Sequence, residues 1–309
     1  MKNDWQLNHV GHMVTNRNAI LKYLQSLRVG VSVGPQPLLP HEDGEGSLTF
    51  YRTLDGDPVT STYPTGGAHN FRDGESQIGD CQLECYAMKP GPGMFITEYL
   101  AQKGPGINHI CFNVQDIDTE TQKLLDAGCD LVFDARVNGK TVENYLDTRK
   151  HGDLMISLRP PATDWELAWK KNNMEHPLVN NWKFLGVGIG VKDVDATVAY
   201  YESLGFAEVG SADSDATMKT KVRQVQVGPL VFEFAQPTGN ESIYQDSFNV
   251  RDEGVNDLIF VVEDLEKETE KLSSSGAEIL LQMDSGHANP YTFFDTRAEG
   301  NIMMRLVQA

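Results

Sequence analysis

The chain has 309 residues, of which 40% are apolar and 23% charged, as expected of a globular protein of about two domains. Its formal charge of −18 at pH 7 repels a phosphate backbone, so we expect no nucleic-acid partner. No apolar run approaches the roughly 20 residues that span a bilayer, and no signal-like stretch opens the chain. We therefore expect a cytoplasmic protein without a membrane partner. The four cysteines form no CxxC pair, which indicates buried, reduced thiols.

The sequence contains internal repeats. Residues 107–158 align without a gap with residues 255–306, and 15 of the aligned positions are identical. A weaker repeat aligns residues 7–27 with residues 184–204. Self-similarity of this kind indicates a chain built from similar structural units. We therefore divide the chain into four units.

Each unit shows the same order of predicted elements. A short apolar strand comes first, expected at residues 7–14, 107–114, 185–191 and 255–262. A helix follows, whose N-cap side chain accepts from free N–H groups of the first turn, at Asn16, Asp116, Asp193 and Asp264. Three helices end at a glycine that tolerates the left-handed conformation, namely Gly128, Gly205 and Gly276. Further strands complete each unit, the last of them at 81–88, 154–159, 230–235 and 302–307.

These elements predict an α+β fold of four βαβββ modules in two tandem halves. The first half is placed at 1–160, with modules at 5–90 and 105–160. A linker at 161–181 leads to the second half at 182–309, with modules at 182–237 and 254–308.

Two segments lie outside the repeated pattern. Residues 30–80 form a Gly- and Pro-rich insertion in the first module, which we expect to be irregular, either a lid or binding loop or a disordered segment. In the linker, we expect Trp165, Leu167 and Trp169 to pack on the surface of one half.

The segment at 83–118, LECYAMKPGPGMFITEYLAQKGPGINHICFNVQDID, carries a family resemblance. It resembles the methylmalonyl-CoA epimerases, within the vicinal-oxygen-chelate superfamily of glyoxalases, bleomycin resistance proteins and extradiol dioxygenases. The GPGINHI stretch is its most specific part. The resemblance implies that two modules pair in each half and that their sheets curl around a cavity. It also implies that metal ligands come from the first and last strands of each module.

The resemblance places three metal ligands on the first half. They are His9 on the first strand of module 1, Glu84 on its last strand, and His109 on the first strand of module 2. The fourth position, usually a glutamate, falls on Ser157. Two imidazoles and a carboxylate suit one divalent cation of Zn, Fe, Mn, Co or Ni and leave positions open for a substrate.

The second half differs at the same four positions, which carry Gly186, Glu233, Asp257 and Arg305. It has no histidine there, and an arginine stands where a carboxylate would be needed. We therefore expect a degenerate half that holds no metal of this type and has a structural role.

Other polar residues near these positions are candidates for the chemistry. Glu143 and Tyr145 lie on the predicted strand beside Ser157, and either could be the catalytic proton-transfer group, although a structural placement stays open. Substrate-binding candidates are Ser157, Tyr86 and Asn113. Strand alternation turns His12 away from His9, so we expect it to be structural. His41 and His69 lie in the insertion and could reach the site only if it folds over.

Three functions follow as hypotheses. The first is a metal-dependent isomerase, epimerase or lyase, acting on a small substrate that chelates the metal through neighbouring oxygens and passes through an enediolate. The second is an Fe²⁺- or Mn²⁺-dependent extradiol-type dioxygenase. The third is a small-molecule-binding protein of the resistance type. A homodimer is compatible with each.

Overall fold

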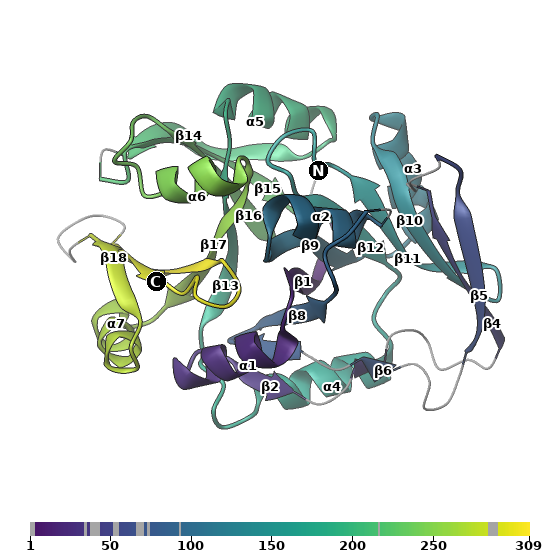
Figure 1. Ribbon diagram of the computed structural model, residues 1–309, viewed down its shortest axis with the longest axis horizontal. Coiled ribbons are helices and arrows are strands. Elements are labelled where there is room, and N and C mark those ends of the chain that lie inside the picture. The colour runs from purple at the N-terminus through teal and green to yellow at the C-terminus, as the bar shows by residue number, and fades with distance from the viewer. Residues whose placement is uncertain are drawn as a thin grey trace.

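The computed structural model describes residues 4–33, 36–37, 44–51, 56–65, 71–72, 75–92, 94–215, 217–283 and 290–309. It contains a ten-stranded sheet built from the first half of the chain and an eight-stranded sheet built from the second half. In Figure 1 the strands β10, β11, β4 and β5 lie at the right, and β14 and β18 lie at the left. None of the helices within the described residues has the length and apolar character needed to cross a membrane.

The N-terminal sheet has the strand order β2-β7-β8-β1-β9-β12-β11-β10-β4-β5. Its strands are β1 (Gln6–Val14), β2 (Val31–Val33), β4 (Gly44–Phe50), β5 (Val59–Thr65), β7 (Glu75–Ile78), β8 (Cys81–Ala87), β9 (Gly106–Asn113), β10 (Asp130–Val137), β11 (Lys140–Asp147) and β12 (Met155–Arg159). A separate pair is formed by β3 (Gln36–Pro37) and β6 (Phe71–Arg72). The helices of this half are α1 (Arg17–Ser26), α2 (Phe95–Lys103) and α3 (Ile117–Asp126).

The C-terminal sheet has the strand order β14-β15-β16-β13-β17-β20-β19-β18. Its strands are β13 (Lys183–Gly190), β14 (Ala207–Asp215), β15 (Thr220–Val227), β16 (Leu230–Pro237), β17 (Gly254–Val262), β18 (Glu278–Gln282), β19 (Tyr291–Asp295) and β20 (Met303–Gln308). Its helices are α5 (Val194–Ser203), α6 (Gln245–Arg251) and α7 (Leu265–Ser274), and α4 (Asp164–Met174) lies between the halves.

All four modules have the same topology. The first strand of each module pairs in parallel with its last strand, as β1 does with β8 and β17 with β20. The first strands of the two modules in a half then pair antiparallel, β1 with β9 and β13 with β17. The predicted α+β fold of four βαβββ modules in two tandem halves is confirmed.

The predicted helix ends are also confirmed. The side chains of Asn16, Asp116, Asp193 and Asp264 each accept from backbone N–H groups of the first turn. The three glycines after the helices have φ of 97°, 94° and 100° at Gly128, Gly205 and Gly276. The four cysteines are buried and free, as expected.

The prediction of an irregular insertion at 30–80 is wrong for several of its described residues. Within it, β4 and β5 form a hairpin, and β4 pairs antiparallel with β10 of the second module. The hairpin extends the sheet at the edge away from module 1, because β10 offers unpaired backbone groups there. His41 and His69 lie outside the described residues.

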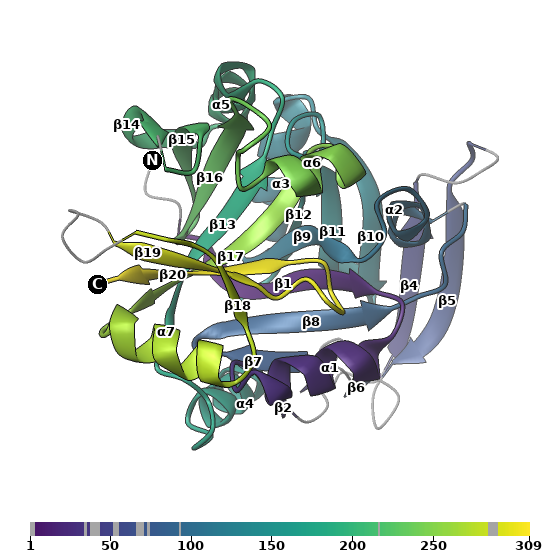
Figure 2. The same cartoon turned by 60° about the vertical axis from the view of Figure 1, so that its left-hand side comes forward.

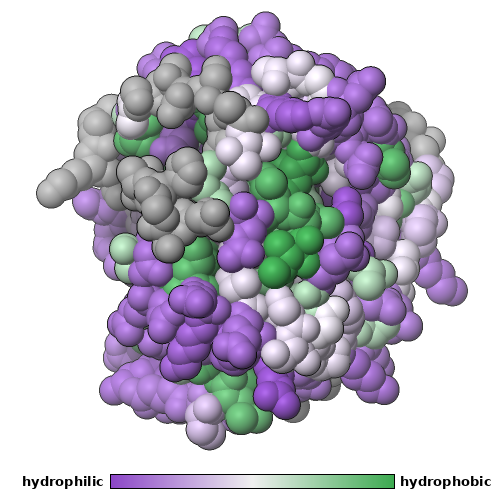
Figure 3. Space-filling model, turned by 90° about the vertical axis from the view of Figure 1, so that its left-hand side faces the viewer, coloured by the Kyte–Doolittle hydropathy of each residue, from purple (hydrophilic) through white to green (hydrophobic). Residues whose placement is uncertain are grey.

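The two halves share one hydrophobic core. A single cluster of buried side chains contains Val10 and Ile110 of the first half together with Phe232 and Leu306 of the second. In Figure 2, β17 runs close to β9, with which it is in contact. On the side of the molecule that carries β14 and β18, hydrophobic residues gather in a strip surrounded by polar ones (Figure 3).

The linker helix α4 buries a charged residue and exposes apolar ones. Glu166 is buried, whereas Trp165 and Leu167 are 41% and 50% exposed. Both side chains are therefore partly covered, and their packing on the surface of one half stays a prediction. Trp165 stacks on Trp169, with 6.4 Å between the ring centroids.

Candidate metal centre

The strand pairings bring the three predicted ligands to one place. In the sheet, Gly11 of β1 lies between Glu84 of β8 and His109 of β9, and His9 lies two residues before Gly11. A Cβ atom on Gly11 would collide with the imidazole of His109. The glycine therefore leaves the space in which that ring turns toward His9.

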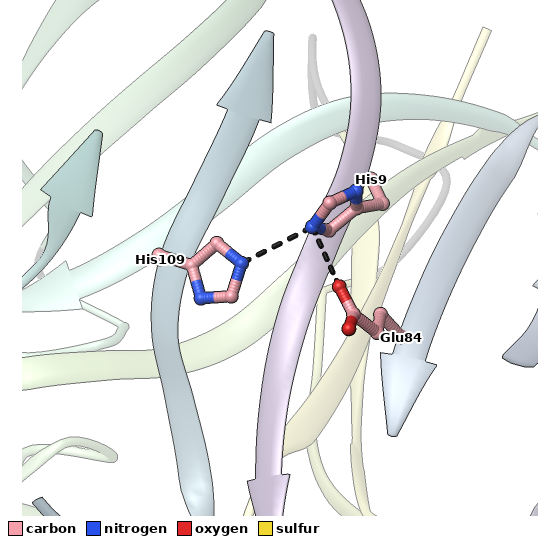
Figure 4. Close-up of side chains that lie close together, drawn as sticks. All are labelled: His9, Glu84 and His109. Carbon is pink, nitrogen blue, oxygen red and sulfur yellow. Dashed lines mark hydrogen bonds and ion pairs between the residues drawn. The ribbon is translucent and has the colours of Figure 1, made fainter. Parts of the chain in front are cut away.

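The side chains of His9, Glu84 and His109 point toward one another (Figure 4). Nε2 of His9 lies 2.7 Å from Oε2 of Glu84 and 3.1 Å from Nε2 of His109. One ligand atom from each residue lies within 4.8 Å of the other two, and all three side chains are buried. A first-row divalent cation binds such atoms at about 2.0–2.2 Å, which requires this degree of convergence.

A β-bulge places an asparagine beside each histidine. In the β1–β9 pairing, Leu7 faces Phe112 and His9 faces Cys111, so Asn8 is an extra residue on its strand. The same pairing skips Asn108 between Ile107 and His109. A bulge redirects a side chain that strict alternation would turn away. As a result, Oδ1 of Asn8 lies 2.8 Å from Nδ1 of His9, and Oδ1 of Asn108 lies 2.7 Å from Nδ1 of His109.

These asparagines prepare the imidazoles for a cation. When Nδ1 donates to an amide oxygen, the proton resides on Nδ1 and Nε2 carries a lone pair. Two Nε2 lone pairs 3.1 Å apart repel each other unless a positive charge lies between them. The donor set and its buried setting therefore fit a divalent cation held by His9, Glu84 and His109.

A second group of polar residues adjoins the ligands. The hydroxyl of Tyr145 lies 3.2 Å from Nε2 of His109. Ser157 donates to Oε1 of Glu143 at 3.3 Å, and Sγ of Cys111 groups with His9 and Glu143 within 4.8 Å. Burial raises the pKa of the Cys111 thiol well above its usual range, which keeps it protonated. The structure thus brings both catalytic candidates, which share strand β11, to the histidine pair: Tyr145 to His109, and Glu143 to His9.

The remaining candidates lie farther from the ligand atoms. Asn113 is buried, accepts from Nδ2 of Asn8 and donates to the carbonyl oxygen of Pro160, so it lies behind His9 rather than beside the ligand atoms. Tyr86 lies at the exposed end of β8, with 37% of its surface accessible. His12 turns to the opposite face of β1, where its Nε2 lies 2.7 Å from the carbonyl oxygen of Gly300.

The second half repeats the register of the site with other residues. Gly188 lies between Glu233 and Asp257, as Gly11 lies between Glu84 and His109. Arg305 takes the position of Ser157, and its guanidinium contacts Glu233 at 2.6 Å and Asp257 at 2.9 Å. Tyr244 also donates to Asp257 at 2.8 Å. A buried arginine cation therefore lies between the carboxylates of this half.

The position of the first-strand ligand is closed in the second half. Gly186 has φ of 155°, and a Cβ atom there would collide with the carbonyl oxygen of Val231. A histidine side chain has no room at this position.

Sequence reasoning missed Asn8 and Asn108. A signal was present, because both ligand histidines follow an asparagine at the start of a strand, in Leu7-Asn8-His9 and Ile107-Asn108-His109. Strand alternation assigned each asparagine to the face opposite its histidine, and only the bulges reverse that assignment.

The comparisons with known proteins agree with this architecture. The family model described as glyoxalase/bleomycin resistance protein/dioxygenase superfamily matches residues 8–144 and 186–293. The chain belongs to this superfamily. A search of curated proteins finds no match.

A solved structure shows the same fold over nearly the whole chain, and others are similar to part of it. A mutant of 4-hydroxymandelate synthase from Streptomyces coelicolor is 14% identical, covers 98% of this chain and 92% of its own, and gives a TM-score of 0.63. Methylmalonyl-CoA epimerase from Mycobacterium tuberculosis is 20% identical over 40% of this chain and 86% of its own, with a TM-score of 0.37. The epimerase from Streptomyces coelicolor is 19% identical over 41% and 96%, also with a TM-score of 0.37.

Proposed function

We propose that the protein is a divalent-metal-dependent isomerase, epimerase or lyase. The observation that supports this most directly is the convergence of His9, Glu84 and His109 beside the carboxylate of Glu143. When bound, the cation supplies Lewis-acid polarisation of two neighbouring oxygens of a small substrate. This polarisation acidifies the adjacent C–H bond.

Glu143 is the base in this proposal. Its carboxylate lies close to His9 and is held by the hydroxyl of Ser157, which can donate to it but cannot take its place as a base. Tyr145 lies beside His109, where its hydroxyl can donate to a substrate oxygen. Glu143 thereby takes over the proton transfer on a strand next to the one where the superfamily usually has its fourth carboxylate.

The first test is elemental analysis of protein purified without chelator or affinity metal, beside His109→Ala. We expect about one Zn, Fe, Mn, Co or Ni per chain and its loss in the variant, because two remaining ligands bind weakly. Wild-type protein that neither carries a metal nor regains one on reconstitution overturns the metal centre.

The second test separates the base from the metal. We expect Glu143→Gln to keep its metal but to exchange substrate protons with solvent deuterium at least about 100-fold more slowly. The probes are a panel of 2-substituted malonyl thioesters and 2-hydroxy or 2-oxo acids, followed by mass spectrometry. Glu175→Gln, on the exposed part of the linker, is the control. Equal exchange by Glu143→Gln and the wild type contradicts the assignment of the base.

A dioxygenase is the second candidate. Three protein ligands of the His₂-carboxylate type leave open positions of the kind used by non-haem Fe²⁺ oxygenases. Anaerobic reconstitution with Fe²⁺, followed by oxygen uptake with a catechol panel, tests it. Ring cleavage without deuterium exchange would place this candidate first.

A further inference from the structure

The linker helix α4 reaches the back of the metal centre. Its buried residue is Glu166, and Nζ of Lys170 on the next turn donates to the backbone oxygen of Asn8 at 2.9 Å. The helix therefore turns two charged groups, Glu166 and Lys170, toward the first half of the chain. Burying charge is costly without a specific partner, so these contacts indicate a role at the site.

The amide of Asn8 is held in one orientation by its neighbours. One N–H of its Nδ2 donates to Oδ1 of Asn113 at 2.8 Å, and the other donates to Oε1 of Glu166 at 2.9 Å. Asn113 is itself fixed, because its own Nδ2 donates to the carbonyl oxygen of Pro160 at 2.6 Å. Turning the Asn8 amide over would point its oxygen at the carboxylate of Glu166, which cannot donate when it is ionised.

Glu166 is suited to remain ionised. Burial alone would raise its pKa, but Arg159 and Lys170 beside it bring the pKa below its usual value. Nη1 of Arg159 lies 3.6 Å from Oε1 of Glu166. The acceptor behind Asn8 is therefore a charged one, which forms the stronger type of hydrogen bond.

We infer that Glu166 is a positioning residue of the metal centre, which sets the tautomer of His9 through Asn8. With its nitrogen held by Glu166, Asn8 presents its oxygen to Nδ1 of His9 at 2.8 Å. His9 then keeps a proton on Nδ1, and its Nε2, which lies 2.7 Å from Oε2 of Glu84, is the nitrogen that faces the ligand cluster. The inference rests on the proposed function for its purpose, but the tautomer itself is a property of the metal-free protein.

The other histidine lacks this anchor. Within the described residues, Nδ2 of Asn108 has no hydrogen-bond partner, so its amide orientation is not fixed by an acceptor. The two histidines thus differ: the asparagine beside His9 is held from the linker, whereas His109 contacts its neighbouring asparagine through Nδ1 and the hydroxyl of Tyr145 through Nε2.

The test uses the full chain and two readouts. The first is the tautomer of His9 in the metal-free protein, measured by ¹H–¹⁵N NMR of the imidazole. The second is the affinity for Zn²⁺ or Mn²⁺, measured by competition with a chromophoric chelator. We expect Glu166→Leu to lower the metal affinity by about 10- to 100-fold and to populate the Nε2–H tautomer of His9. Glu166→Gln should retain most of the affinity, because its amide oxygen can still accept from Asn8. Glu175→Leu, at the exposed end of the same helix, should change neither readout.

A double-mutant cycle tests whether Glu166 acts through Asn8. Glu166→Leu should have no further effect in an Asn8→Ala background, because the link is already broken. Asn8→Ala also reports on the link if Glu166→Leu does not fold, since it leaves the contact with Arg159 in place. An unchanged tautomer in either variant, or a full additional loss in the double variant, overturns the inference. If the wild type binds no metal, the proposed function fails, yet the NMR readout still decides this inference.

Discussion

Arg305 and Ser157 occupy the same register position in the two sheets but create opposite electrostatic settings. Ser157 is neutral and adds no positive charge beside the carboxylates of the first half. Arg305 provides a permanent cation, buried between Glu233 and Asp257. Burial raises the pKa of Asp257, and the guanidinium opposes that rise. Removing the arginine therefore leaves two neighbouring buried carboxylates without the cation that lies between them.

We expect Arg305→Met to lower the free energy of unfolding by about 3–5 kcal/mol, as for other broken buried ion pairs. Urea denaturation at pH 7 measures it. Arg297→Met is the matched control, because Arg297 pairs with Asp295 where both side chains are partly exposed, and such a pair contributes about 1 kcal/mol or less. Equal losses in the two variants would show that Arg305 has no special role.

At the level of single residues, the sequence predicted the converging set His9, Glu84 and His109 because each residue type suits a cation and falls at a corresponding strand position. The contacts of Asn8 and Glu166 did not follow from it, because they depend on a bulge and on where a linker helix lies, although the repeated Asn-His pair was a signal for Asn8. Neither feature has a periodic signature in the sequence.

The stability of the helix in each module depends on the N-cap residue that precedes it. Asp264 accepts from the backbone N–H of Lys267 at 3.0 Å and so satisfies one free donor of α7. We expect Asp264→Ala to cost about 1 kcal/mol of stability, measured by thermal or urea unfolding. Glu270→Ala, at an exposed position within α7, should be close to neutral. A cost for Asp264→Ala no greater than for the control would contradict the capping role.

Among the elements, caps and glycine ends were predictable because their signal is local. The β4–β5 hairpin was not, because β4 pairs with β10, which lies more than eighty residues later in the chain. β4 contains two glycines and β5 a proline, so both resemble loop sequence, and they become strands where β4 pairs with the edge of module 2.

The two halves meet at His12, which lies on β1 and faces Gly300 of the second half. Burial lowers the pKa of His12 from 6.5 to about 4. In the unfolded chain it binds a proton near pH 6.5, so protonation favours unfolding below that value. The free energy of unfolding should therefore fall by up to about 3 kcal/mol as the pH falls from about 6.5 to about 4. Above pH 6.5, His12 should make no pH-dependent contribution to it.

Urea unfolding across this pH range checks the contribution of His12. We expect His12→Gln, which can still donate to the carbonyl of Gly300, to show a flatter dependence between pH 4 and pH 6.5 than the wild type. His176→Gln, at an exposed position in the linker, should keep the wild-type slope. Identical slopes for all three proteins would show that His12 is not the group that titrates.

The closed position at Gly186 limits how the second half can change through mutation. A histidine there would need the backbone beside Val231 to move first, so no single substitution can add this ligand position. Any new chemistry in the second half must therefore be built around the buried Arg305 rather than around a histidine on the first strand.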